Sequence, residues 1–195
     1  MLSNLKYLEN NIMKKLFLSV FAVATMAFAS QVHAQKNPMV GGAEMYATKD
    51  IVDNAVNSKD HTTLVAAVKA AGLVQTLKGT GPFTVFAPTN AAFDKLPAGT
   101  VATLVKPENK ATLTKILTYH VVAGKMDSKA IAAAIKAGGG KAELTTVEGG
   151  KLWASMEGKK LVLKDEKGGK STVTIANVNQ KNGIIHVVDT VLMPK

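Results

Sequence analysis

The segment GPFTVFAPTNAAF at residues 81–93 places a strand, a proline and a helix start in close succession. The β-branched and aromatic residues of Phe83–Ala87 favour a strand, and because nearly every position is apolar we expect burial on both faces. Pro88 should end the strand, because the residue before a proline is held in extended conformations. Thr89 or Asn90 can then cap a helix that carries the segment's last phenylalanine inward. The segment therefore predicts a direct connection from sheet to helix.

Apolar residues recur at helical spacing on both sides of this segment. They predict a helix from residue 50, a second one capped by Asp60 or Thr62, and a longer one opened by Pro107. The longer helix should run into a strand at Tyr119-His120, and a further helix, capped by Asp127 or Ser128, is expected over 130–137. We interpret these apolar stripes as faces that pack into a core.

The last third of the chain changes to short strand-like runs separated by turns rich in glycine, which is typical of hairpins. The runs are 143–147, 151–156, 160–164, 171–178 and 184–192, and Asn182-Gly183 is the turn predicted between the last two. Helices first and hairpins second predict the α+β class.

The N-terminal region has the parts of a secretory signal peptide. Met13-Lys14-Lys15 supplies a basic start, residues 16–29 form an apolar run, and Ala34 ends a sequence that signal peptidase can cleave. We expect a signal peptide over residues 1–34, with translation starting at Met13. The apolar run is too short to span a bilayer comfortably, so the mature chain should be secreted or periplasmic, without a transmembrane segment.

Residues 35–48 contain a proline and two glycines but no apolar period, and we interpret them as a linker that is dispensable for folding. Residues 49–195 should then form a single domain. Loss of residues 1–34 would remove three lysines and one glutamate, which lowers the formal charge from +10 to +8.

The charge and the residue types exclude several functions. The chain has no cysteine, which excludes disulfides and thiol chemistry, and all 24 of its basic residues are lysine. Sequence-specific nucleic-acid binding is not expected, because bidentate reading of bases and phosphates favours arginine. Lysines instead attract polyanions diffusely.

Catalytic and metal-binding patterns were weighed against structural roles. His61, His120 and His186 lack a paired ligand spacing, so no metal site is expected. His186 and Asp189 should face opposite sides of one strand, which disfavours a joint catalytic role. No nucleophile elbow or phosphate-binding loop is present, so the sequence predicts neither an enzyme nor a cofactor.

Residues 81–93, the Tyr119-His120 pair and residues 183–192 together resemble the three signature segments of the fasciclin family of secreted adhesion domains. The resemblance covers residues 49–195. It implies a wedge or sandwich of two small β-sheets with a helical layer against one side. It also implies non-covalent attachment to a cell surface, matrix or biofilm, by contact with a surface protein or glycan.

The resemblance places binding at Tyr119 and His120, and we add the neighbouring turn at Thr89 and Asn90 as candidate binding residues. The alternative for Tyr119-His120 is purely structural, since a junction of helix and strand tends to be buried. Two other functions stay open: a small-molecule or lipid-binding module with a pocket between helices and sheet, and a catalytic domain. We expect a monomer.

Overall fold

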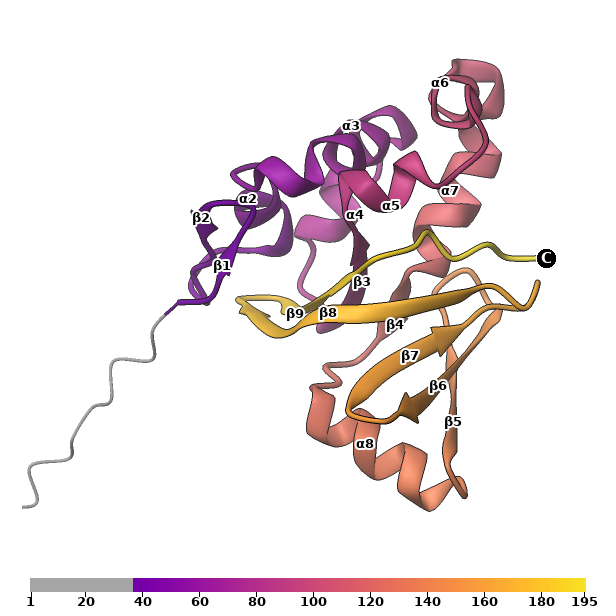
Figure 1. The fold of residues 1–195 in the computed structure, drawn as a ribbon. Coiled ribbons are helices and arrows are strands. Elements are labelled where there is room, and N and C mark those ends of the chain that lie inside the picture. The colour runs from indigo at the N-terminus through magenta and orange to yellow at the C-terminus, as the bar shows by residue number, and fades with distance from the viewer. Residues whose placement is uncertain (1–36) are drawn as a thin grey trace, which may run out of the picture. The chain divides into compact units, whose positions relative to one another are not determined.

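The computed structural model describes residues 37–195, and nine strands in two sheets run through this part of the chain (Figure 1). The strands are β1 Met39–Val40, β2 Ala43–Glu44, β3 Phe83–Pro88, β4 Val121–Ala123, β5 Lys141–Thr145, β6 Lys151–Glu157, β7 Lys160–Lys164, β8 Lys170–Gln180 and β9 Gly183–Val188. β1 and β2 form a hairpin, and the other seven strands form one sheet in the order β4-β3-β9-β8-β7-β6-β5.

The helices of this region are short, and two 3₁₀ turns accompany them. The helices are α2 Ile51–Ala55, α3 Thr62–Ala71, α4 Val74–Lys78, α5 Asn90–Asp94, α6 Thr100–Leu104, α7 Lys110–Tyr119 and α8 Ser128–Ala137, and the 3₁₀ turns are Lys59–His61 and Pro107–Asn109. Within residues 37–195, none of the helices has the length and apolar character needed to cross a membrane.

The strand predicted at the start of the signature segment is confirmed as β3, which extends one residue further than expected. β3 lies inside the sheet, parallel to β9 and antiparallel to β4, and five of its six residues are buried. Thr89 is the N-cap of α5, and its side chain accepts a hydrogen bond from Ala92 N at 3.2 Å. The direct connection from sheet to helix is therefore confirmed.

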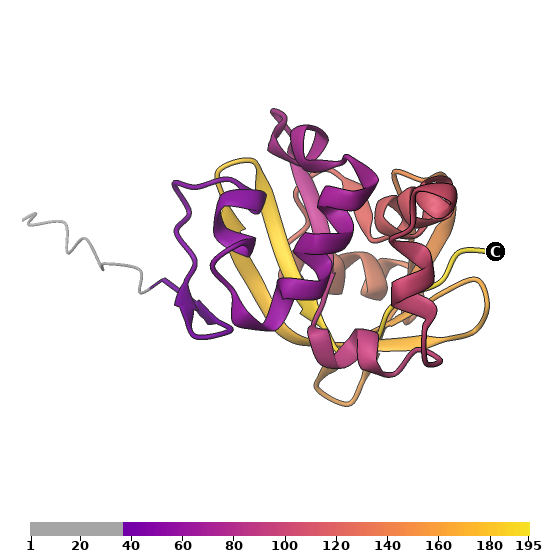
Figure 2. The same cartoon turned by 90° about the horizontal axis from the view of Figure 1, so that it is seen from above.

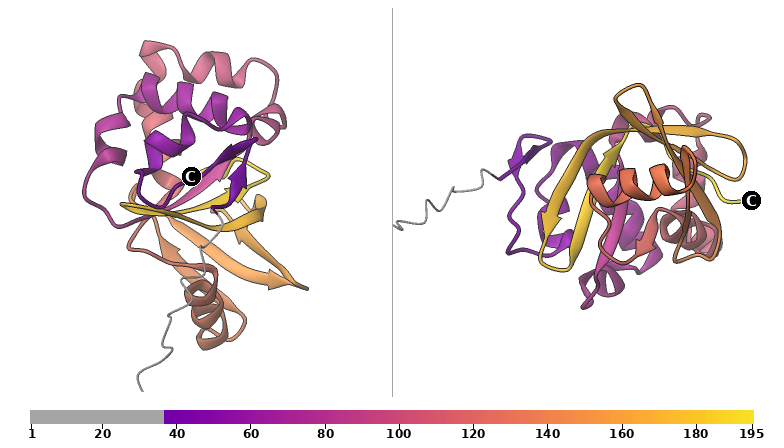
Figure 3. Two further views of the ribbon diagram at one scale, coloured as in Figure 1. Left: turned by 90° about the vertical axis from the view of Figure 1, so that its left-hand side faces the viewer. Right: turned by 90° about the horizontal axis from the view of Figure 1, so that it is seen from below.

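The α+β class and the two packed sheets are also confirmed. The two packed sheets are the halves of one curled seven-stranded sheet, and β8 belongs to both halves (Figure 3). β8 pairs with β7 near its start and with β9 along the rest, and its register shifts where it bends. At the other end the backbone N of Val147 donates to Val121 O at 2.7 Å. That contact brings the region after β5 against β4, so the sheet nearly closes.

The main core fills the inside of the curled sheet and includes Phe86, Tyr119 and Leu192, none of which is exposed. α8 covers the open end of this core with Ile131 and Ile135 (Figure 1). The other helices form a layer over the opposite face of β3, β4 and β9 (Figure 2). The prediction of a helical layer on one side therefore holds for α2–α7, while α8 packs separately.

The segment predicted as a linker differs in the structure. Residues 39–44 form the β1–β2 hairpin, and Val40 and Met45 are buried against the sheet. Gly41 and Gly42 both have positive φ angles, so they make a tight turn and not a flexible spacer. Val40 and Met45 are only two buried side chains, so they create no apolar period in the sequence. The segment was therefore predicted as a linker. The predicted signal peptide and the start at Met13 lie outside the described residues.

The predicted N-cap of α3 was wrong. α3 begins after His61, which makes no capping hydrogen bond with its side chain, and Asp60 lies in the preceding 3₁₀ turn. Of the two predicted caps, Asp60 is inside the 3₁₀ turn Lys59–His61 and Thr62 is the first residue of α3. By contrast, Asp127 caps α8 through a hydrogen bond from Ala130 N at 2.7 Å, as predicted.

Candidate functional site

Tyr119, the last residue of α7, is completely buried in the main core. Its hydroxyl donates to the backbone O of Lys151 at 2.6 Å and accepts from the backbone N of Glu166 at 3.1 Å. Burial raises the pKa of the Tyr119 phenol to about 12, so it stays neutral. Tyr119 therefore ties the helix end to the start of β6 and to the turn after β7.

His120 is also buried, and both of its ring nitrogens are used. Nδ1 lies 2.9 Å from the carbonyl O of Ile116, and Nε2 lies 3.0 Å from the backbone N of Leu192. A carbonyl can only accept and an amide N–H can only donate, so Nδ1 carries the hydrogen and the ring is neutral. Burial lowers the pKa of His120 to about 4, which keeps it neutral at physiological pH. His120 joins α7 to the C-terminal segment.

The turn at Thr89 and Asn90 is half-buried and is held by its own hydrogen bonds. Asn90 Oδ1 accepts from the backbone N of Thr63 at 3.0 Å, and Asn90 Nδ2 donates to Lys59 O at 2.9 Å. These bonds tie α5 to the start of α3. Among the described residues no hydrogen bond joins this turn to Tyr119 or His120. All four predicted residues have structural tasks, and their contact with a partner stays a prediction.

A cavity of about 90 Å³ lies between helices α2–α4 and the outer face of β3 and β9, where the alternative interpretation expects a pocket. Its lining is almost entirely apolar, with Ile51, Leu64, Val68, Leu77, Val85 and Ile185 among the residues that contact it. His61 lies on its wall and is buried, with Nδ1 2.8 Å from Ser58 Oγ. Sequence reasoning considered His61 only as a metal ligand and missed this position.

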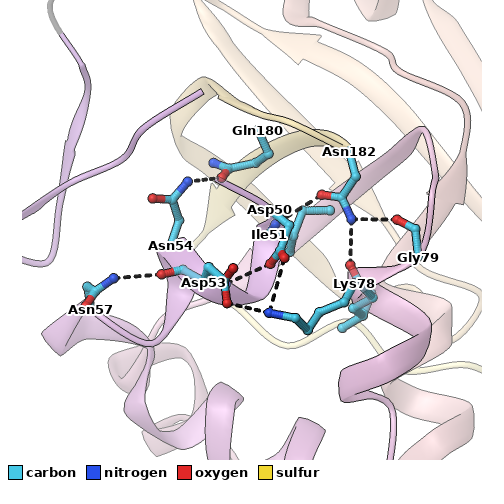
Figure 4. Close-up of polar contacts among 10 residues, drawn as sticks. Asp50, Ile51, Asp53, Asn54, Asn57, Lys78, Gly79, Gln180 and Asn182 are labelled. Carbon is cyan, nitrogen blue, oxygen red and sulfur yellow. Dashed lines mark hydrogen bonds and ion pairs between the residues drawn. The ribbon is translucent and has the colours of Figure 1, made fainter. Parts of the chain in front are cut away.

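Polar contacts at the β8–β9 turn hold the helices that form one wall of this cavity (Figure 4). The side chain of Asn182 accepts from Ile51 N at 3.1 Å and donates to Leu77 O at 2.8 Å and to Gly79 O at 2.9 Å. Asn182 therefore anchors α2 and α4 together, although in the sequence it marks only an Asn-Gly turn.

α2 has a second anchor in Asn54, whose amide donates to Tyr46 O at 2.7 Å and to the side chain of Gln180 (Figure 4). Outside, Lys78 on α4 bridges to Asp50 at 3.2 Å and also contacts Asp53. Buried amides with all their bonds made allow little movement, so the cavity wall is rigid.

The outer face of β5–β7 carries the single tryptophan and several lysines. In β6, Leu152 and Ala154 point into the core, and Trp153 between them points outward, opposite Glu143 on one side and Lys164 on the other. By the strand registers, the lysines of this face are Lys141, Lys151, Lys160, Lys164 and Lys170. We call it the lysine face.

Two lysines of this face are neutralised and three are not. Glu143 bridges to Lys151 at 2.7 Å and Glu157 to Lys170 at 2.6 Å. Lys141 lies over the Trp153 ring, with Nζ 5.2 Å from the ring centroid. Within residues 37–195, the remaining two, Lys160 and Lys164, form no ion pair, and neither does Lys141. The lysine face therefore has an excess of positive charge beside an aromatic ring.

Comparison with protein families decides the identity. The model of the fasciclin domain matches residues 59–194, which is most of the chain. The chain belongs to the fasciclin family. This is a family of non-enzymatic adhesion domains, whose members bind cell-surface or matrix partners.

Relatives of this fasciclin domain occur in several bacteria. The chain is 45% identical over 174 residues to protein sll1483 of Synechocystis, covering 87% of each protein. It is 36% identical over 168 residues to the cell surface glycolipoprotein MPB83 of Mycobacterium bovis, covering 83% of this chain and 69% of the relative.

The fold agrees with a solved structure of a fasciclin domain pair from the insect cell adhesion molecule fasciclin I. The TM-score is 0.66 at 20% identity, and the match covers 74% of this chain and 51% of the insect chain. The chain thus spans about half of that domain pair, and the likeness concerns the fold alone.

The stability of this fasciclin domain should fall as the pH decreases from about 6.5. Burial is the main cause that lowers the pKa of His61, His120 and His186, that of His120 to about 4. Below pH 6.5 these histidines bind protons in the unfolded chain but stay neutral in the folded chain. Acid therefore lowers the free energy of unfolding until the pH reaches the pKa of the folded state. For His120 the shift corresponds to roughly 3 kcal/mol of unfolding free energy.

Urea unfolding between pH 7.5 and pH 5 measures this loss, before most carboxylates titrate. The variant His120→Gln should show a shallower dependence on pH, even if it is less stable at pH 7.5. A free energy of unfolding that stays constant over this range would contradict the assignment of buried neutral histidines.

Proposed function

We propose that the protein is an exported adhesion module that attaches a bacterial surface to an acidic polymer through its lysine face. Membership of the fasciclin family supports adhesion as the class of function. The cell-surface location stated in the name of MPB83 supports export. The observation that carries the proposal is that three lysines without ion pairs, Lys141, Lys160 and Lys164, share one sheet face with Trp153, with Lys141 and Lys164 beside its ring.

The chemistry of the lysine face suits a polymer with spaced carboxylates or sulfates, such as an acidic polysaccharide. Lys160 and Lys164 are free to pair with anionic groups, and the half-buried Trp153 ring offers an apolar plane against which a sugar ring can stack. Exposed ammonium groups also raise the rate of encounter with a polyanion.

In this proposal Tyr119 does not contact the polymer but holds the strands of the lysine face in position. Its hydroxyl holds the backbone of Lys151, where β6 begins, and of Glu166, which follows β7. Both strands present the lysine face, so Tyr119 fixes the separation of the groups that would contact the polymer. A rigid surface loses less conformational entropy on binding than a mobile one.

The test compares how binding changes when three lysines are neutralised on the lysine face and when three are neutralised on other surfaces. Binding of the purified protein to immobilised alginate, a polymer of uronic acids, is measured at 0.05 M and at 1 M salt. The triple variant Lys141→Gln, Lys160→Gln, Lys164→Gln should bind roughly tenfold more weakly at low salt, from three exposed charge contacts. Trp153→Ala should remove binding that survives 1 M salt, where the Debye length is about 3 Å.

The matched control changes three exposed lysines that lie on other surfaces, namely Lys106→Gln, Lys129→Gln and Lys181→Gln, and gives the same net charge. The control should bind alginate nearly as well as the wild type. If both triple variants lose the same affinity, the attraction is a property of the net charge and the lysine face is not a site. Immobilised neutral dextran should bind none of the proteins.

A further inference from the structure

The cavity under α2–α4 contains one polar atom that the fold itself does not satisfy. His61 is 3% exposed, and its Nε2 has no hydrogen-bond partner within residues 37–195. Buried polar side-chain atoms almost always have a partner, so an orphaned nitrogen at a cavity wall points to a group that comes from outside.

The hydrogen bond between Ser58 and His61 determines whether Nε2 of His61 is a donor or an acceptor. The Ser58 hydroxyl lies 2.8 Å from His61 Nδ1, and the described residues offer its hydrogen no other acceptor. If the hydroxyl donates to Nδ1, the hydrogen of the neutral imidazole is on Nε2. Nε2 of His61 is then an N–H donor without an acceptor among the described residues.

The neutral state of His61 follows from its surroundings. Burial is the main cause that lowers the pKa of His61. The backbone of Ala87, which lies near the ring but outside hydrogen-bonding geometry with Nε2, and the carboxylate of Asp60 offset only part of this effect. Because Asp60 is the charged group that acts on the ring, an anion placed at Nε2 would be repelled.

The other residues that line the cavity determine the size and polarity of the ligand that it can hold. The cavity of about 90 Å³ is several times larger than the roughly 10–15 Å³ that one water molecule requires. The other polar residues of the lining are Lys69, Thr76, Thr118 and His120. Lys69 and Thr76 are exposed, the Thr118 hydroxyl donates to Thr114 O, and both ring nitrogens of His120 already have partners. The interior therefore suits an apolar chain or ring.

We propose that the cavity binds a small neutral apolar molecule with one oxygen acceptor, such as a ketone or an ester, with that oxygen on His61 Nε2. The site is formed before the ligand arrives, because the amides of Asn54 and Asn182 hold α2 and α4 in place. It is separate from the lysine face, and its occupation does not depend on adhesion.

The test uses 2-heptanone as the probe and xenon as a purely apolar control. Titration of the isotope-labelled purified protein with 2-heptanone should shift the NMR signals of the cavity residues saturably, and should shift the His61 Nε2–H signal with them. His61→Phe should weaken 2-heptanone binding by roughly tenfold, the worth of one buried hydrogen bond. Xenon should enter both proteins alike, since apolar cavities accept it without hydrogen bonds.

Several results would overturn the proposal. They are the absence of saturable shifts up to the solubility limit of 2-heptanone, an unmoved His61 signal, tighter binding of heptanoate than of 2-heptanone, or equal affinity of wild type and His61→Phe. If His61→Phe fails to fold, His61→Gln replaces it: the glutamine amide keeps a donor and should retain most of the binding. Loss of 2-heptanone binding in a folded His61→Gln variant together with an unmoved wild-type ring signal would count against the assignment.

Discussion

Replacing Phe86 with alanine should lower the free energy of unfolding by about 3–5 kcal/mol. Phe86 lies in β3, is completely buried, and stacks on the ring of His186 with the two centroids 5.7 Å apart. Its removal leaves a cavity inside the curled sheet, where strands on both sides prevent collapse. Because a domain of ordinary stability has about 5–15 kcal/mol in total, the variant should be at the edge of unfolding at 37 °C.

Urea unfolding followed by circular dichroism measures this effect. The control Val105→Ala removes an apolar side chain from a position that is 37% exposed and should change the free energy by less than about 0.5 kcal/mol. A Phe86→Ala variant as stable as this control would mean that β3 is not the centre of the core.

Replacing His120 with alanine should have the second largest effect, a loss of roughly 3 kcal/mol. The change leaves the carbonyl of Ile116 and the amide N–H of Leu192 buried without partners, and it empties the space of the ring. Tyr119→Phe keeps the ring and removes only the hydroxyl contacts with Lys151 and Glu166, so it should cost about 1–2 kcal/mol.

These two variants also separate a structural role from a binding role. Measured together with alginate binding, Tyr119→Phe and His120→Ala should lower the melting temperature, while any folded fraction still binds. If instead the melting temperature is unchanged and binding is abolished, Tyr119 and His120 contact the partner directly. That outcome would move the adhesion site from the lysine face to the signature pair.

The local structure was predicted where neighbouring residues control it. Pro88 and Thr89 determine the end of β3 and the cap of α5 through backbone sterics and a hydrogen bond three residues away. Asp127 caps α8 for the same reason. The Asn-Gly dipeptide at 182–183 likewise predicted the β8–β9 turn.

The position of the candidate sites could not be predicted in this way. Asn182 contacts Leu77 and Ile51, which are more than 100 residues away in the chain, and Trp153 meets Lys141 only through the pairing of β5 with β6. Single residues at such distances leave no period in the sequence. The hairpin at residues 39–44 was missed for the same reason, since only Val40 and Met45 anchor it to the core.

The sequence by itself determined the class of fold and the family of this protein, because apolar periods, proline, glycine and capping residues act over a few positions and are visible in any single chain. Only the tertiary structure decided where the candidate functional residues lie. In the folded chain Tyr119 and His120 point inward, His61 Nε2 is unpaired at a cavity, and Lys141, Lys160 and Lys164 lie on the same sheet face as Trp153. The physical reason is that burial and hydrogen-bond pairing depend on contacts between distant segments, which exist only once the sheet has curled and the helices have packed on it.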